Sequence, residues 1–310
     1  FWGFLLGGLF LYTSYYGTDQ SQVQRELSAP TVRDTRRSLV LNGLARFPLT
    51  LLYVFLGLAV GAAALHSTSL RAAIPADRPD YLVPQFILHQ VPAGLRGLLF
   101  AAILAAAMSS LDSALNSLSA ATMRDFVAPR LKGKDPAVEL RLSKWTTVIW
   151  GAVITGLAFA AGAMPGTVIT GINKVGSAFY GPILAAFLVG ILSKRTTGSG
   201  VIAGVVAGVS FNVGLWILDV VLEAQGLGDY TTYWMWWNVT GLVIAVVVAV
   251  VVSRFGAAPD ASKLEGTTLS VSGLVAEEKK YAGIHAALVG YFVVILLVVI
   301  FARQLLEAMV

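Results

Sequence analysis

The stretch GLLFAAILAAAMSSLDSALNSLSAATMRDF, residues 97–126, is apolar enough to form a membrane-spanning helix, yet it carries polar side chains in its middle. A helix needs about 20 apolar residues to cross a bilayer, and the segment from Leu98 to Met123 supplies them. An ionisable side chain at that depth costs roughly 2.5 kcal/mol or more unless it faces protein, water or a ligand. The stretch therefore predicts a helix with a functional face. Its polar residues are Ser109, Ser110, Asp112, Ser113, Asn116 and Ser119.

Helical periodicity places most of these side chains on one face. Ser109, Asp112, Ser113, Asn116 and Ala120 fall at i, i+3, i+4, i+7 and i+11. Sodium is a hard cation that prefers oxygen ligands, and hydroxyl groups together with helix carbonyls can replace its hydration shell. Serines also let membrane helices pack closely, but packing does not require a carboxylate. The face therefore favours a sodium site, and a proton carried by Asp112 is the alternative.

The composition of the chain agrees with a membrane protein. It has 310 residues, of which 56% are hydrophobic and 13% charged, whereas about 25% are charged in soluble domains. The chain has no cysteine, which excludes disulfides and thiolate chemistry. Its three histidines are scattered, and no clustered acid, base or metal-ligating set indicates an enzyme.

Windows of about 20 apolar residues predict eight membrane spans. Most of the 22 Lys and Arg residues fall in loops on one side, so the positive-inside rule orients the chain and explains its net charge of +5 without a nucleic-acid partner. The run YWMWW, residues 233–237, is typical of an aromatic belt at the interface. The expected spans are Trp2 to Tyr16, Leu39 to Leu65, Leu98 to Met123, Trp145 to Ala163, Val168 to Leu192, Val201 to Leu222, Trp234 to Val252 and Ile284 to Ala302.

Two other spans contain polar residues. The first span runs through two tyrosines into Gly17 and Asp19 before it clears the membrane. Gly17 can supply the permissive backbone of a broken helix that lines a cavity, although a simple helix end is an equal alternative. The fifth span begins with Asn173 and Lys174; snorkelling to the headgroups accounts for the lysine.

Three motifs resemble the sodium/solute symporters, the family of the sodium/glucose, sodium/proline and sodium/sialic acid transporters. They are TDQSQVQRELSA at 18–29, AAAMSSLDSALNSLSAATMRDF at 105–126 and GPILAAFLVGILSKRTTGSG at 181–200. The resemblance implies an all-α polytopic membrane bundle with the LeuT-type inverted-repeat fold. Residues 1–200 would hold core helices six to ten, the second repeat, and residues 201–310 three peripheral transmembrane helices. The N-terminal repeat would be missing, so a fragment is expected.

The resemblance also implies site residues. A first sodium would bind the hydroxyls of Ser109 and Ser110 and the carbonyl of Ala106, and a second sodium would bind at Asp112 and Ser113. In this family the broken sixth core helix and the start of the tenth line the central cavity. The substrate-binding residues implied in this way are Tyr15, Tyr16, Asp19, Gln20 and Asn173. Arg46 could pair with an anionic substrate or with Asp19, and snorkelling accounts for it equally well.

We expect sodium-coupled symport of a small polar organic solute by alternating access, with Na⁺ as the coupling ion. The solute would be a sugar, an organic anion or an amino acid, and the protein would be multi-pass in the plasma (inner) membrane. No enzymatic activity and no nucleic-acid partner are expected. Two alternatives stay open, a proton-coupled transporter and a transporter-like sensory input module of a signalling protein.

Overall fold

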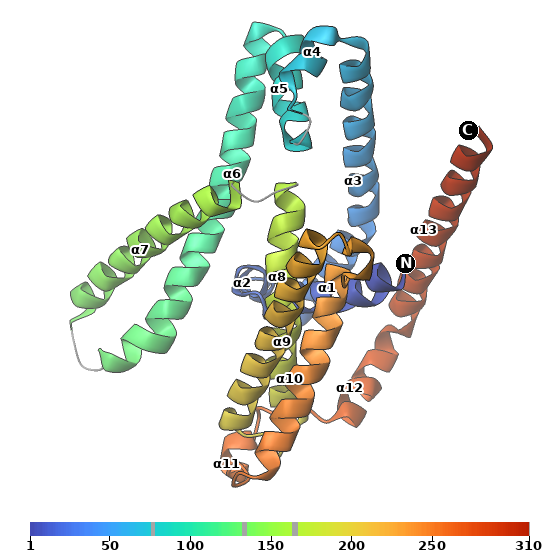
Figure 1. Cartoon of the computed structure of the whole chain (residues 1–310). Coiled ribbons are helices and arrows are strands. Elements are labelled where there is room, and N and C mark those ends of the chain that lie inside the picture. The colour runs from blue at the N-terminus through green and yellow to red at the C-terminus, as the bar shows by residue number, and fades with distance from the viewer. Residues whose placement is uncertain (76–77, 132–134, 163–166, 310) are drawn as a thin grey trace. The chain divides into compact units, whose positions relative to one another are not determined.

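The computed structural model describes residues 1–75, 78–131, 135–162 and 167–309, and all regular elements within these ranges are helical (Figure 1). Within these described ranges, seven helical segments could cross a membrane by length and composition, which agrees with the expected all-helical polytopic class. The expected first span is helical over Gly3–Thr18 but shorter than these seven. Ala163, where the expected fourth span ends, lies outside the described residues. The seven segments are Val32–His66, Ala93–Arg130, Pro136–Gly162, Val168–Leu192, Gly198–Ala224, Gly228–Arg254 and Val275–Phe301.

The chain forms two compact units. Unit 1 consists of Phe1–Arg25, Gly57–Tyr180 and Thr232–Asn238. Unit 2 consists of Glu26–Leu56, Gly181–Thr231 and Val239–Val310. Three long helices, α3 (Val32–His66), α8 (Val168–Leu192) and α10 (Trp237–Arg254), continue from one unit into the other.

In unit 1 the first helix packs closely on an aromatic segment. A π-helical turn, η1 (Gly3–Gly7), leads into α1 (Gly8–Thr18), and η6 (Trp234–Trp236) lies against it. A Cβ atom on Gly7 would lie 2.2 Å from the carbonyl oxygen of Met235, so only glycine allows this approach. Trp237 is 1% exposed. Trp237 thus contributes to helix packing inside the unit, and the aromatic belt expected for the run at 233–237 stays a prediction.

A helical hairpin forms the largest part of unit 1. Helix α6 (Ala93–Thr122) continues through η3 (Met123–Val127) and η4 (Ala128–Arg130), and it packs on α7 (Pro136–Gly162) (Figure 1). The contacts lie in the second half of α6. Thr147 Oγ1 donates to Ser119 Oγ at 3.1 Å, and Trp150 Nε1 donates to Thr122 Oγ1 at 2.9 Å. Ser119 is thus a packing residue.

Short helices connect α3 to α6 within unit 1. They are α4 (Thr68–Ala73), η2 (Pro79–Tyr81) and α5 (Leu82–Gln90). Leu70 on α4 is 0% exposed and Ile87 on α5 is 5% exposed, so these two side chains form the core of the connection. Asp80 Oδ2 accepts a hydrogen bond of 2.9 Å from the backbone N–H of Val168. This contact satisfies an N–H group in the first turn of α8.

Glycines form the main helix contact of unit 2. Helix α9 (Gly198–Ala224) lies beside α10 (Figure 1). Its glycines at 200, 204 and 208 recur every fourth residue and face α10. A Cβ atom on Gly204 would lie 2.4 Å from the carbonyl oxygen of Ala245, and one on Gly208 would lie 2.6 Å from that of Gly241. Such a pattern of small residues lets two membrane helices approach closely. The chain's hydropathy alone did not indicate this contact.

The remaining elements of unit 2 are the short segments that follow α9 and α10, and the last long helix. They are η5 (Gly228–Tyr230), α11 (Ala261–Leu264), α12 (Val271–Glu278), η7 (Lys279–Tyr281) and α13 (Ala282–Met309). The Tyr291 hydroxyl on α13 donates a hydrogen bond of 2.7 Å to the backbone carbonyl of Leu44 on α3. Helices α3 and α13 are therefore neighbours in this unit.

Candidate substrate and sodium sites

The helix that begins the chain is broken, but at Asp19 and not at Gly17. Helix α1 ends at Thr18, Asp19 is extended with φ −74° and ψ 119°, and α2 (Gln20–Leu27) follows at once. Gly17 lies within the last turn of α1. Asp19 Oδ1 accepts hydrogen bonds from the backbone N–H groups of Ser21 at 2.8 Å and Gln22 at 3.3 Å. The carboxylate therefore caps α2, which explains why the break falls there.

Tyrosines gather just before this break. The rings of Tyr15 and Tyr16 meet edge to face with centroids 5.2 Å apart, and Tyr16 also stacks on Tyr12 at 6.4 Å. Gln22 Nε2 donates a hydrogen bond of 2.8 Å to the Tyr15 hydroxyl, which joins the two sides of the break. Both predicted tyrosines are half-buried, whereas the predicted Gln20 is exposed.

Helix α8 borders the same region of unit 1. Ser14, which is 0% exposed, donates a hydrogen bond of 2.9 Å to the backbone carbonyl of Tyr180. The Tyr180 side chain lies close enough to Asp19 and Tyr15 to interact with them electrostatically. The part of α8 that belongs to unit 1 therefore contacts the broken helix near Tyr180.

Asn173, the predicted residue on α8, shares a helix face with two others. Ser177 and Tyr180 follow it at i+4 and i+7, and Asn173 is half-buried. Ser177 is 0% exposed and accepts a hydrogen bond of 3.1 Å from Asn238 Nδ2. The sequence interpretation did not include Ser14, Ser177 or Tyr180. The spacing of polar residues along α8 was the available signal for the last two.

The predicted sodium ligands all lie on α6. Ser110 Oγ donates to the Ala106 carbonyl oxygen and Ser113 Oγ to the Ser109 carbonyl oxygen, each at 3.2 Å. For oxygens about 2.3–2.6 Å from a hard cation and at right angles to one another, the separation is roughly 3.3–3.7 Å. The Ser110 and Ala106 oxygens, two predicted ligands of the first sodium, therefore have nearly the spacing that a shared cation requires. The second pair contains the Ser109 carbonyl and not the predicted Ser109 hydroxyl.

The middle of α6 presents these groups on an open surface. None of the most apolar window of Ala93–Arg130 is buried, and Ala106, Ser109, Ser110 and Asp112 are all exposed. Asn116 Nδ2 donates a hydrogen bond of 3.3 Å to Asp112 Oδ1 on the same helix. The polar atoms thus bond along α6 itself, and they remain accessible to an ion.

A positive charge reaches the same face from the broken helix. Arg25 Nη2 on α2 donates a hydrogen bond of 2.6 Å to Ser113 Oγ. A guanidinium at this position opposes a second cation at Ser113, because like charges repel. The next residue, Glu26, is partly buried, and this burial raises the pKa of its carboxyl. Helix α2 therefore connects the predicted substrate region to the predicted sodium face.

Comparison with known proteins identifies the class. The model of the sodium:solute symporter family matches residues 1–208 of the chain. The chain therefore belongs to the sodium:solute symporter family, as the sequence motifs predicted. The seven apolar helices within the described residues agree with this membership.

Several named transporters are similar in sequence. Human sodium-coupled monocarboxylate transporter 1 is 31% identical over 219 residues, which cover 70% of this chain and 35% of the relative. The human sodium/iodide cotransporter is 27% identical over 220 residues, 70% of this chain and 34% of the relative. The chain thus spans about a third of the length of the relatives it matches.

A solved structure supports the fold. A Na⁺-coupled sialic acid symporter, in a substrate-bound outward-open state, matches 83% of this chain and 50% of its own. The TM-score is 0.61 and the sequence identity is 22%. This likeness extends the fold assignment beyond the residues that the family model matches.

Proposed function

We propose that the protein is a sodium-coupled symporter of a small organic solute, and that the oxygen face of α6 forms part of its sodium-binding site. The observation that carries this proposal is that the Ser110 hydroxyl lies 3.2 Å from the Ala106 carbonyl oxygen, so that two oxygens of the proposed first sodium site are neighbours on α6. The ligands are the carbonyl of Ala106 and the hydroxyls of Ser109 and Ser110 for one sodium, with Asp112 and Ser113 for a second.

The chemistry of these ligands suits a monovalent cation. Neutral hydroxyl and carbonyl oxygens can replace the water around sodium without the cost of several buried carboxylates. Sodium binding then favours the conformation that binds solute, and by reciprocal coupling the solute raises the affinity for sodium. Two repeats that move around a central site carry both across the membrane.

The membrane potential supplies much of the driving force. Moving one charge inward across 100 mV is worth about 2.3 kcal/mol. This free energy corresponds to a solute gradient of roughly 50-fold, since about 1.4 kcal/mol equals a factor of ten. A symporter can use this free energy without any covalent reaction step.

The names of the relatives support an organic anion as solute, with monocarboxylates first. Tyr15, Tyr16, Asp19, Gln20 and Asn173 form the substrate-binding set of the proposal. The Asp19 carboxylate accepts backbone hydrogen bonds and caps α2, whereas tyrosine hydroxyls and amide side chains are the hydrogen-bond donors of this set and suit a solute carboxylate. Sugars and amino acids are the other two solute classes of the proposal.

The same proposal includes the organisation and location of the chain. Residues 1–200 form the second half of the transporter core, and residues 201–310 form three peripheral helices. The three long apolar helices that begin at Gly198, Gly228 and Val275 support this division. The basic loops support insertion in the plasma (inner) membrane with those loops inside.

The function is tested by solute uptake into proteoliposomes that contain the purified protein. A panel of labelled monocarboxylates, sugars and amino acids is offered in sodium buffer and in choline buffer at the same pH. We expect uptake of one solute class only in sodium. Equal uptake in both buffers contradicts sodium coupling, and absence of uptake for the whole panel contradicts a symporter of these solutes.

Proton coupling through Asp112 is the second candidate, because this carboxylate lies on the exposed face of α6. A proton gradient imposed without sodium distinguishes the two. Uptake driven by that gradient, and abolished by Asp112→Asn, supports a proton carrier. Uptake that requires sodium at every pH supports the sodium site.

A further inference from the structure

A cavity of about 450 Å³ lies in unit 2, and its lining residues are not among the proposed substrate and sodium ligands. Three arginines line one side of it: Arg33, Arg36 and Arg37 on the first turns of α3. Their spacing of i, i+3 and i+4 places them on one helix face. Its volume is within the range of about 300–1,000 Å³ that is typical of ligand sites. The apolar lining residues are Val40, Leu41, Tyr281 and Ile284.

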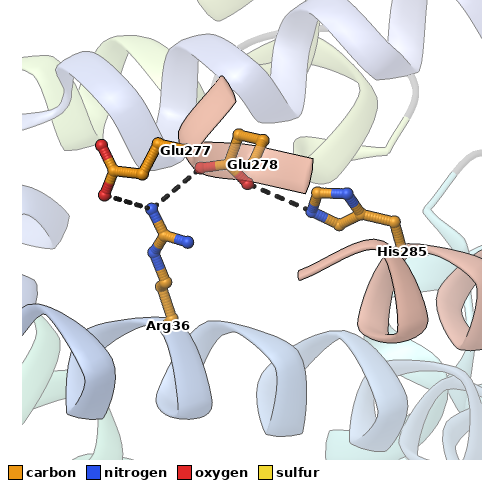
Figure 2. Close-up of polar contacts among 4 residues, drawn as sticks. All are labelled: Arg36, Glu277, Glu278 and His285. Atoms are coloured by element: carbon orange, nitrogen blue, oxygen red, sulfur yellow. Dashed lines mark hydrogen bonds and ion pairs between the residues drawn. The ribbon is translucent and has the colours of Figure 1, made fainter. Parts of the chain in front are cut away.

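An ion-pair cluster holds the two walls of this cavity together (Figure 2). Arg36 Nη2 lies 2.8 Å from Glu278 Oε1 and 3.5 Å from Glu277 Oε1, and its guanidinium carbon lies 4.0 Å from the centre of the Tyr281 ring. His285 Nε2 lies 3.3 Å from the other oxygen of Glu278. Arg36 therefore fixes α12 and the start of α13 to α3.

Glutamate carboxylates form ion pairs with Arg36, whereas the cations beside Arg36 have weaker ion pairs. Arg37 is 62% exposed, and its nearest carboxylate oxygen, on Asp34, is 4.0 Å away. Arg33 is also exposed. Lys279 and Lys280 add two exposed cations at the end of the same cluster. The open rim of the cavity is therefore positively charged, which favours an anionic ligand.

The position of the arginines along α3 indicates the depth in the membrane at which a ligand of this cavity binds. The arginines directly precede the apolar part of the α3 span, and cationic side chains at the end of a span lie at headgroup depth. Val40 and Leu41 follow one turn deeper, and Ile284 faces the same cavity. Leu41 is 66% exposed and Ile284 is 42% exposed. The cavity thus offers cations at headgroup depth and an apolar wall toward the acyl chains.

We propose that this cavity binds an anionic phospholipid of the leaflet on the side of the basic loops. The headgroup phosphate lies at Arg33 and Arg37, since arginine forks match phosphate oxygens. One acyl chain lies along Val40, Leu41 and Ile284. Inorganic phosphate shares the first contact but gains nothing from the apolar wall, so it binds more weakly at this site.

Native mass spectrometry of the detergent-purified protein tests the proposal with two lipids of the same acyl chains, phosphatidylglycerol and phosphatidylcholine. We expect retention of phosphatidylglycerol in preference to phosphatidylcholine. The double variant Arg33→Gln, Arg37→Gln should weaken phosphatidylglycerol binding roughly 10- to 30-fold, the effect of two cations at a charged membrane surface. The matched control, Lys194→Gln with Arg195→Gln in the exposed loop after α8, should retain it.

A third variant tests the acyl wall without changing any charge. Ile284→Trp fills the cavity and should lower phosphatidylglycerol binding while the protein keeps its thermal unfolding midpoint. The proposal is overturned by equal loss in the Lys194 and Arg195 control, by full binding in Ile284→Trp, or by displacement of the lipid with millimolar inorganic phosphate. Binding that is equal for the two lipids also overturns it.

Discussion

Helices α6 and α9 both contain many small residues, but they use them differently. In α9 the glycines lie against the backbone of α10, with Gly200, Gly204 and Gly208 all buried. In α6 the run of alanines and serines at 105–110 is exposed along its whole length. Two polar residues of α9, Asn212 and Asp219, are also buried; Asn212 is 0% exposed and accepts a hydrogen bond of 3.1 Å from Thr240 Oγ1.

The difference shows that small residues alone do not distinguish packing from function in a membrane helix. What distinguishes the two is the partner of the polar atoms. Within α6 itself, Ser119 and Thr122 bond to residues of α7, whereas Ser110 bonds to a carbonyl of its own helix. Ser113 bonds to a carbonyl of its own helix and also accepts a hydrogen bond from Arg25 on α2. Ser119 and Thr122 stabilise the hairpin, and Ser110 remains available to a ligand.

The strongest test of this comparison is to enlarge a glycine of α9. Gly204→Leu places a side chain where even a Cβ atom would lie 2.4 Å from a backbone oxygen, so α9 and α10 must separate. We expect a loss of 3 kcal/mol or more in the free energy of unfolding, about the upper end for overpacked cores. Thermal unfolding in detergent, followed by tryptophan fluorescence, measures it.

The control is Gly214→Leu on the same helix, where a Cβ atom has no neighbour within 4 Å. This variant should be neutral or slightly stabilising, because glycine lowers helix stability by about 0.5–1 kcal/mol relative to alanine. If both variants unfold at the same temperature, close packing of α9 on α10 is not the source of stability in unit 2.

A smaller effect is expected in the packed half of α6. Thr122→Val removes the acceptor of the Trp150 indole N–H, and an unsatisfied buried donor costs about 1–3 kcal/mol. We expect a lower unfolding midpoint and an unchanged dependence of uptake on sodium concentration. A changed sodium dependence with normal stability would assign Thr122 to the transport site and not to the hairpin.

The smallest effect is expected at Arg25, which donates to Ser113 on the proposed sodium face. Arg25→Gln removes a charge that opposes sodium, so the apparent sodium affinity should rise roughly twofold to fivefold, as for a screened pair of charges. Arg25→Lys keeps the charge and should leave the affinity near that of the parent. A sodium titration of solute uptake measures both. Weaker sodium binding in Arg25→Gln would contradict this prediction and would show that Arg25 stabilises the sodium site.

Structural features that depend on hydropathy and on local residue spacing could be predicted from the sequence. The spans from Leu39 onward, the shared face of Ser109 and Ser113, and a break near the end of the first helix all follow from such patterns. The position of the break was missed by two residues, because glycine permits a bend at Gly17 but the Asp19 carboxylate determines it by capping α2.

Contacts between distant segments could not be predicted in this way. The bond between Ser14 and the Tyr180 carbonyl joins residues 166 positions apart, and the Arg25 to Ser113 bond joins residues 88 apart. Periodicity indicates which residues share a face, but it does not identify the helix that this face meets. The glycines of α9 did have a regular spacing, and a search for that spacing would have predicted their contact.

The most direct test of the account is a sodium titration of solute uptake by the double variant Ser109→Ala, Ser110→Ala. Ser210→Ala, an exposed serine in the middle of α9, serves as the matched control. The account predicts that the double variant needs at least roughly 10-fold more sodium for half-maximal uptake, at an unfolding midpoint close to that of the parent, while the control behaves as the parent. An unchanged sodium requirement in a well-folded double variant would contradict the assignment of the sodium site to α6.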